Sequence, residues 1–149
     1  MTKRKTMTEK RYINWNELHQ DTKILADKIK KSGVYTKIIA VSRGGLIPAS
    51  IVSYELNIRN IQTVNVLSYD GEKQRPDTAF VAESHIRDAD EQTLIIDDVS
   101  DTGKTFQLFH KMFPKAKLAA VYAKPTGVKY VDIYAVDIPD KWLVFPWDV

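Results

Sequence analysis

Apolar positions recur with helical spacing in the segment between Asn14 and Gly33. Asn14 and Glu17 form the pattern of an N-terminal capping box, and Gly33 is a typical C-terminal stop. The sequence therefore predicts one amphipathic helix here. Its apolar stripe consists of Leu18, Ile24, Leu25 and Ile29.

Short apolar runs alternate with helical patterns along the rest of the chain. Strands are predicted at residues 37–41, 61–67, 94–97, 118–123 and 134–136, and helices at residues 48–56 and 105–113. Proline at position 48 suits the first turn of a helix. This alternation predicts an α/β fold, an open and mostly parallel twisted sheet with helices on both faces. Such sheets bind ligands at the carboxyl ends of their strands.

In residues 70–83 the apolar positions follow no clear period. The segment is polar and contains Gly71 and Pro76. A flexible hood loop over the ligand site is the simplest interpretation.

Length and composition narrow the class of protein. The 149 residues fit a single domain, residues 1–149, with one substantial core. The net charge is +3, but five basic residues and one acidic residue place +4 in the first eleven positions. The remainder sums to −1, so bulk charge does not indicate a nucleic-acid-binding face.

Cysteine and targeting signals are missing from the sequence. Without cysteine, disulfides, thiolate metal sites and a cysteine nucleophile are excluded. No apolar run could span a bilayer and no signal peptide is visible, so we expect a soluble, cytoplasmic protein with no transmembrane segment. Met7 begins a stretch typical of a native start, and we expect residues 1–6 to be a disordered extension.

The segment at residues 94–105 carries the most specific chemistry. A buried apolar run predicts a strand that delivers the carboxylates of Asp97 and Asp98 to its end. A tight loop then leads into a helix. Backbone N–H groups and the N-terminus of that helix therefore converge beside the two carboxylates. Phosphate and a divalent cation are the natural joint occupants. The loop reads Asp101-Thr102-Gly103-Lys104-Thr105.

Two other interpretations of this segment carry less weight. A P-loop NTPase would share Gly-Lys-Thr, but it requires glycine where this chain has Asp98. A strand that ends in solvated aspartates before a capped helix is common in α/β proteins. The full spacing of apolar run, paired acids and loop is far more restrictive than that.

A second glycine-containing loop, Ser42-Arg43-Gly44-Gly45, follows the strand predicted at residues 37–41. Paired glycines let backbone N–H groups approach an anion, and Arg43 offers a charged fork for phosphate. Taken alone, this segment would be an ordinary exposed turn.

With both loops in place, the chain resembles the phosphoribosyltransferases. Within that family it is similar to the bacterial xanthine-guanine type and, more loosely, to the hypoxanthine-guanine type, from Met7 to Asp148. Lys104 stands where the first type often has glycine and the second has lysine, which leaves the order of preference among purines open. The matching segments are residues 38–46, 68–70, 74–75, 96–98, 101–103, 123–125, 136–139 and 146–148.

The resemblance implies an enzyme of purine salvage. Such a transferase moves 5-phosphoribose from 5-phosphoribosyl 1-pyrophosphate to N9 of a 6-oxopurine (guanine, xanthine or hypoxanthine) and releases pyrophosphate. It further implies dependence on Mg²⁺ and assembly as a homodimer or homotetramer. The site must neutralise an anionic leaving group and tolerate positive charge on the ribose ring.

The same resemblance implies roles for individual residues. Asp97 and Asp98 lie at the ribose and Asp98 holds the metal, while Asp101 lies near purine N7 as the catalytic residue. Thr102 to Thr105 hold the 5′-phosphate. The expected phosphoribosyl pyrophosphate site comprises Arg43, Gly44, Arg75, Asp97, Asp98, Val99, Ser100, Asp101, Thr102, Gly103, Lys104 and Thr105.

Three further residues are implied to read the purine beside Asp101. Lys124 donates to O6, Trp142 stacks on the base, and the Leu143 carbonyl reads the 2-substituent. Without the resemblance, Lys124 would be a solvated strand end and Trp142 a core or interface residue. The three histidines (His19, His85 and His110) show no metal-ligand spacing and are expected on surfaces.

Two functions of other classes are also considered. A regulatory protein could keep the ribose-phosphate motif and bind RNA or DNA, but it would need a basic face or an added segment that the sequence does not show. An interaction module without activity is disfavoured by the intact acids and arginines: Arg43, Arg75, Asp97, Asp98 and Asp101.

Overall fold

The computed structural model describes residues 9–67, 81–83, 86 and 88–148. Arg75, His85, residues 1–6 and most of the expected hood loop lie outside the described residues. Within the described part, no helix is both long and apolar enough to cross a membrane.

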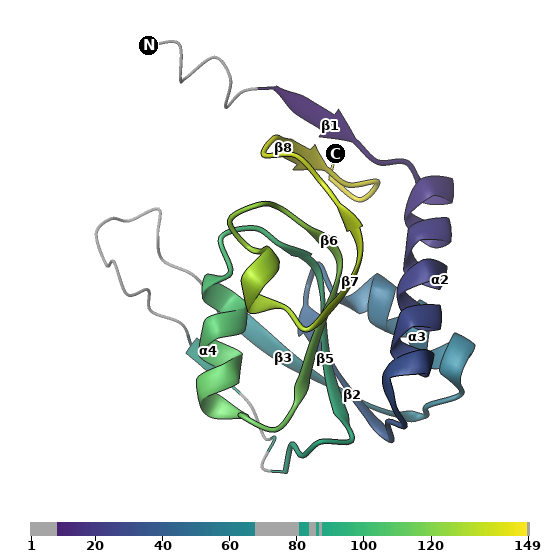
Figure 1. Ribbon diagram of the computed structural model, residues 1–149, viewed down its shortest axis with the longest axis vertical. Helices are drawn as coiled ribbons and strands as arrows, with labels where there is room; N and C mark the ends of the chain where they lie inside the picture. The colour runs from purple at the N-terminus through teal and green to yellow at the C-terminus, as the bar shows by residue number, and fades with distance from the viewer. Residues whose placement is uncertain (1–8, 68–80, 84–85, 87, 149) are drawn as a thin grey trace.

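The centre of the fold is a six-stranded sheet with the order β4-β3-β2-β5-β6-β7 (Figure 1). Five strands are parallel, and β4 runs antiparallel to β3. This mostly parallel sheet confirms the predicted α/β class. The strands are β2 (Lys37–Ser42), β3 (Asn60–Leu67), β4 (Val81–Glu83), β5 (Thr93–Ser100), β6 (Lys117–Ala123) and β7 (Ile133–Asp137).

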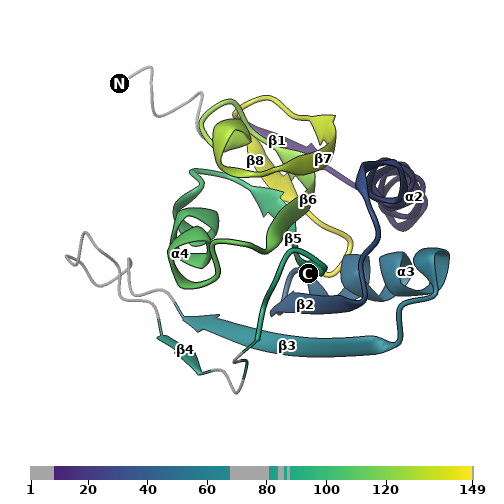
Figure 2. The ribbon, with the colours of Figure 1, turned by 60° about the horizontal axis from the view of Figure 1, so that its bottom comes forward.

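Helices cover both faces of this sheet, as Figure 2 shows. Helices α2 (Trp15–Ser32) and α3 (Leu46–Leu56) lie on one face, and α4 (Lys104–Met112) lies on the other. Successive residues of β5 divide between the two faces, because Ile96 packs with the first pair of helices and Ile95 with α4. Burial on both faces explains why the central strands are continuous apolar runs rather than alternating ones.

The connections place a topological switch point between β2 and β5. From β2 the chain passes through α3 to β3, on one side, whereas from β5 it passes through α4 to β6, on the other. The two loops that leave β2 and β5 therefore diverge from adjacent strands. Ligands bind in the crevice that such divergence opens.

A second, two-stranded sheet was not predicted. It consists of β1 (Lys10–Tyr12) and β8 (Trp142–Val144), which run parallel. Strands of three residues are too short to show a period, so nothing in the sequence distinguished them from loop.

Several predicted boundaries agree with the structure and others need correction. Helix α2 begins as predicted, with the Asn14 side chain accepting a hydrogen bond from the N–H of Glu17 at 2.8 Å. Helix α3 begins at Leu46, two residues before the predicted start. The expected loop at residues 70–83 was wrong at its end, because β4 pairs with β3 there. A short 3-10 helix, η2 (Val128–Tyr130), was not predicted.

The prediction that β5 ends at residue 97 was also wrong. Pairing with β6 continues to Ser100, which lies opposite Ala123. Asp97 and Asp98 are thus held inside a strand rather than in a loop at its end.

Candidate functional site

The two glycine-containing loops meet at the switch point. A Cβ atom on Gly44 would lie 2.3 Å from Oδ2 of Asp98, and one on Gly45 would lie 2.4 Å from the carbonyl oxygen of Ile96. The glycines therefore allow the loop after β2 to lie directly on the acidic part of β5. The Ser42–Arg43 peptide bond in this loop is cis, and Arg43 is exposed.

The paired acids on β5 are oriented by their own backbone. Oδ1 of Asp97 accepts a hydrogen bond from the N–H of Asp98 at 2.8 Å, and Oδ1 of Asp98 accepts one from Val99 at 2.7 Å. Burial raises the pKa of both carboxyl groups, and the neighbouring Asp98 raises that of Asp97 further. The negative charge of Asp148 adds to the rise at Asp98. A cation or a set of hydroxyl donors would relieve this concentration of negative charge.

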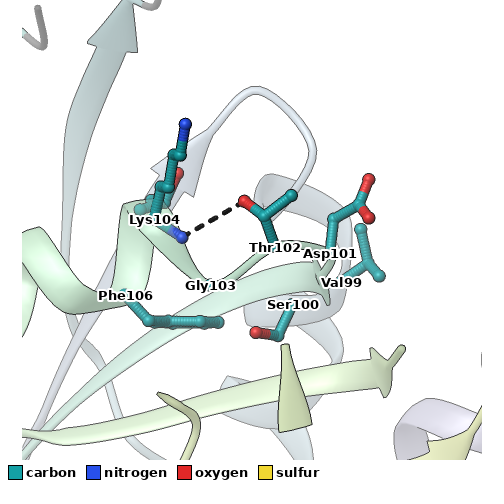
Figure 3. Close-up of a pocket in the computed structure, with 8 residues that line it drawn as sticks. Val99, Ser100, Asp101, Thr102, Gly103, Lys104 and Phe106 are labelled. Carbon is teal, nitrogen blue, oxygen red and sulfur yellow. Dashed lines mark hydrogen bonds between the residues drawn. The ribbon is translucent and has the colours of Figure 1, made fainter. Parts of the chain in front are cut away.

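Beyond the acids, the chain forms an open pocket lined by residues 99–106 (Figure 3). Its cavity volume of about 70 Å³ suits a small anionic group better than a whole ligand of drug size. Helix α4 begins in this pocket, and its N-cap residue Gly103 provides no side-chain cap. The first N–H groups of a helix attract anions, because they lack helical partners and carry the positive end of the dipole.

Gly103 is required at its position. Its φ is +87°, and a Cβ there would lie 2.1 Å from the ring of Tyr130. A left-handed backbone conformation and close packing both favour glycine. The N–H of Lys104 points back to Oγ1 of Thr102 at 3.4 Å, the dashed line in Figure 3.

Residues after β6 support this loop, and sequence reasoning missed them. Thr126 donates to the carbonyl oxygen of Asp101 at 2.8 Å, and Ser100 donates from Oγ to the carbonyl oxygen of Gly127 at 2.7 Å. A Cβ on Gly127 would lie 2.2 Å from the Ser100 carbonyl oxygen. The Pro-Thr-Gly sequence was a visible turn signal, but it did not reveal which loop the turn contacts.

The structure brings Lys124 to this loop. The Lys124 Nζ lies 3.4 Å from Oδ1 of Asp101, and the lysine is buried at the end of β6. The alternative of a solvated strand end does not fit this burial. The predicted purine donor and the predicted catalytic acid are therefore neighbours.

Trp142 and Leu143 belong to β8, in the separate sheet. The Trp142 side chain is 63% exposed, which excludes the core position considered for it, whereas Leu143 is buried. His19 and His110 lie exposed on α2 and α4, as expected.

The comparisons with known proteins agree with this geometry. The family described as phosphoribosyl transferase domain matches residues 10–149. A xanthine-guanine phosphoribosyltransferase from Idiomarina loihiensis is 45% identical over 139 residues, covering 93% of this chain and 86% of that protein. One from Cereibacter sphaeroides is 37% identical over 144 residues, with the same two coverages.

A solved structure is also similar to this chain. The purine phosphoribosyltransferase from Pyrococcus horikoshii superposes with a TM-score of 0.80 and 31% sequence identity, covering 95% of each chain. A sheet with a switch point, paired acids on β5 and a pocket at the start of α4 are the features of an α/β protein with a ligand site at the strand ends. The chain belongs to the phosphoribosyltransferase family.

Proposed function

We propose that this chain is an enzyme of purine salvage that transfers 5-phosphoribose from 5-phosphoribosyl 1-pyrophosphate to N9 of a 6-oxopurine. Xanthine-guanine phosphoribosyltransferases among its relatives support this reaction. The observation that carries the proposal is the Lys124–Asp101 pair beside the pocket at residues 99–106. A donor for a purine oxygen and an acid for a ring nitrogen thus lie next to a phosphate-sized site.

The pocket at the start of α4 would bind the 5′-phosphate through its backbone N–H groups. Val99 and Ser100 also line the pocket, where Thr102, Lys104 and Thr105 would add hydroxyl and ammonium groups. Gly44 lies against Asp98 on β5, and Arg43 and Gly44 would contact the pyrophosphate from there. We assign Arg75 to the same task on the resemblance alone.

Asp97 and Asp98 would accept hydrogen bonds from the ribose hydroxyls. As bond breaking places positive charge on the ribose ring, these carboxylates would stabilise it electrostatically. Asp101 would receive the proton from purine N7 as N9 attacks the ribose, which is general base catalysis.

The donor set on β5 fits Mg²⁺. Among the described residues, no three His, Asp or Glu side chains gather into a metal cluster. Two adjacent carboxylates suit a cation that keeps several waters and binds substrate oxygens as well. When bound through Asp98, the ion would neutralise the charge of the leaving pyrophosphate.

Lys124 would select for an oxygen at purine position 6. An ammonium group has donors only, so a 6-amino group would face it with a second donor. Trp142 would stack on the base, and the Leu143 carbonyl would accept from a 2-amino group.

Location and assembly follow the same proposal. We expect the enzyme to act in the cytoplasm as a homodimer or homotetramer, on substrates that are small molecules rather than nucleic acid. The relatives give no support to the regulatory alternative that binds RNA or DNA.

One assay tests the proposed function. Pyrophosphate release is measured with guanine, xanthine, hypoxanthine and adenine, with Mg²⁺ and with chelator. Activity is expected with the three 6-oxopurines, only in the presence of Mg²⁺. Adenine turnover equal to that of guanine, or full activity in chelator, would contradict the proposal.

A further inference from the structure

Two polar contacts connect helix α2 to strands β1 and β6. Nη2 of Arg11 on β1 lies 2.7 Å from Oε2 of Glu17. The Tyr122 hydroxyl on β6 donates to Oδ2 of Asp21 at 2.6 Å. Glu17 and Asp21 are four residues apart, so they lie on the same face of α2. The two pairs, which are joined through one turn of α2, are together called the network; they connect β1, α2 and β6.

Tyr122 is the buried member of this network. It is 0% exposed, and its ring belongs to the core between the sheet and α2. Burial and the hydrogen bond to Asp21 raise the pKa of Tyr122, so the phenol remains a neutral donor. A buried hydroxyl that loses its partner costs free energy, which makes the Tyr122–Asp21 geometry a strong constraint.

The network joins two parts of the proposed base site that the main sheet does not join. Among the described strands, β8 pairs with β1 and with no strand of the six-stranded sheet. Arg11 is the register partner of Leu143, and Lys124 follows Tyr122 by two residues. The two ends of the network therefore lie beside the proposed readers of the 2-substituent and of O6.

Aromatic packing connects the same two parts. The ring of Tyr122 lies 6.0 Å from that of Phe145, just after β8. Phe145 stacks on Trp147 at 5.0 Å, and Trp147 contacts Trp15 at the start of α2 with ring centroids 6.0 Å apart. The Tyr122 ring is thus packed against the segment that follows Leu143.

We propose that Tyr122 and Asp21 are positioning residues that set the placement of β8 relative to Lys124 and thereby the selectivity at purine position 2. This inference rests on the proposed function. Lys124 directly follows β6 and does not move with β8, so recognition of O6 is retained when the network is broken. Recognition of the 2-substituent by the Leu143 carbonyl is lost, because Leu143 lies on β8.

The test compares guanine with hypoxanthine, which differ only in the 2-amino group. In Tyr122→Phe, the KM for guanine is expected to rise about fivefold, the loss that one hydrogen bond of ordinary strength would give. The KM for hypoxanthine should rise less, because hypoxanthine has no 2-amino group for the Leu143 carbonyl and shares only the stacking on Trp142 of β8. The KM for 5-phosphoribosyl 1-pyrophosphate should stay within about twofold. Asp21→Leu should match Tyr122→Phe, whereas Asp21→Asn should retain selectivity, because an amide oxygen still accepts from the phenol.

Tyr134→Phe is the matched control. The Tyr134 hydroxyl bonds to Oδ1 of Asp137 at 2.9 Å, so it is a tyrosine–aspartate pair of the same kind, but exposed and on β7. Selectivity in this variant should equal that of the wild type.

Two results would overturn the inference. One is a lower melting temperature in Tyr122→Phe with an unchanged ratio of guanine to hypoxanthine KM, which would show a purely structural role. If Tyr122→Phe does not fold, the same ratio of KM values is measured in Arg11→Leu, at the half-exposed end of the network. An unchanged ratio in that variant would equally overturn the inference. A wild-type protein that is inactive with every 6-oxopurine overturns the proposed function and this inference with it.

Discussion

The ammonium group of Lys124 and the carboxylate of Asp101 form an ion pair at 3.4 Å in which the two partners differ in exposure. The Lys124 side chain is 8% exposed and that of Asp101 is 57% exposed. The lysine is thus held in place by the fold, whereas the aspartate can change partner when a purine arrives. A buried ammonium group needs a hydrogen-bond acceptor to offset the hydration that it has lost.

Removal of the lysine should erode base discrimination. In Lys124→Ala, kcat/KM for guanine is expected to fall about 10- to 100-fold, because a hydrogen bond from a charged group is lost. The fall for adenine should be smaller, since the mismatched donor disappears with the lysine. Steady-state kinetics with both bases measure this ratio. Lys141→Ala, at a half-exposed lysine 3.9 Å from Glu9, is the control and should leave it unchanged.

The proposed role of Asp101 in proton transfer predicts a different kinetic pattern. In Asp101→Asn, kcat should fall by about 10²–10⁴, the range of general acid–base catalysis, with little change in KM for 5-phosphoribosyl 1-pyrophosphate. The amide keeps the shape but cannot accept the proton. Asp27→Asn, at an exposed pair with Lys31 on α2, should behave as the wild type. An unchanged kcat in Asp101→Asn would show that Asp101 transfers no proton.

Local signals in the sequence predicted the elements that carry the proposed ribose-phosphate site. The loop at residues 101–103 was recognisable from the spacing of an apolar run, paired acids and a glycine-containing turn, whereas the loop at residues 42–45 gained meaning only beside it. The contacts between these loops were not predictable, since Gly44 against Asp98 and Gly103 against Tyr130 depend on which strands become neighbours. The pairing of β1 with β8 was not predictable either, because it too depends on which segments become neighbours in the fold. Its stability comes from tertiary packing, not from three residues of local pattern.

The contact between Gly44 and Asp98 predicts that even a methyl group disrupts the acidic site. In Gly44→Ala, the new Cβ would meet Oδ2 of Asp98 at 2.3 Å, so the carboxylate must move. Overpacking of this kind costs about 1–3 kcal/mol, and KM for 5-phosphoribosyl 1-pyrophosphate should rise about tenfold or more. Gly33→Ala is the control, because its nearest neighbour would be the Tyr35 hydroxyl at 3.4 Å. Equal kinetics in the two variants would contradict the prediction.

The raised pKa of Asp97 predicts how stability depends on pH. Burial and the charge of Asp98 hold this pKa above its ordinary value, so the folded protein binds protons more tightly than the unfolded chain. Stability of the metal-free protein should therefore fall as pH rises from the unfolded pKa through the raised one. Asp97→Asn, which keeps an oxygen for the Asp98 N–H, should flatten this fall and raise the melting temperature at neutral pH. Melting curves between acidic and neutral pH in chelator measure the effect, and a variant less stable than the wild type at neutral pH would contradict it.

The exposure of Trp142 predicts an effect on binding without an effect on folding. An indole that is 63% exposed contributes little to the core, and it offers a free face to a purine. Stacking of a base on an aromatic side chain is worth about 1–3 kcal/mol, so Trp142→Ala should raise KM for every accepted purine by roughly 5- to 150-fold. The factor should be similar for guanine, xanthine and hypoxanthine, because stacking does not read their substituents. Tyr54→Ala on α3, at a tyrosine that is 86% exposed, is the matched control and should leave every KM unchanged. Purine constants that stay at wild-type values in Trp142→Ala while the melting temperature falls would instead assign Trp142 to packing.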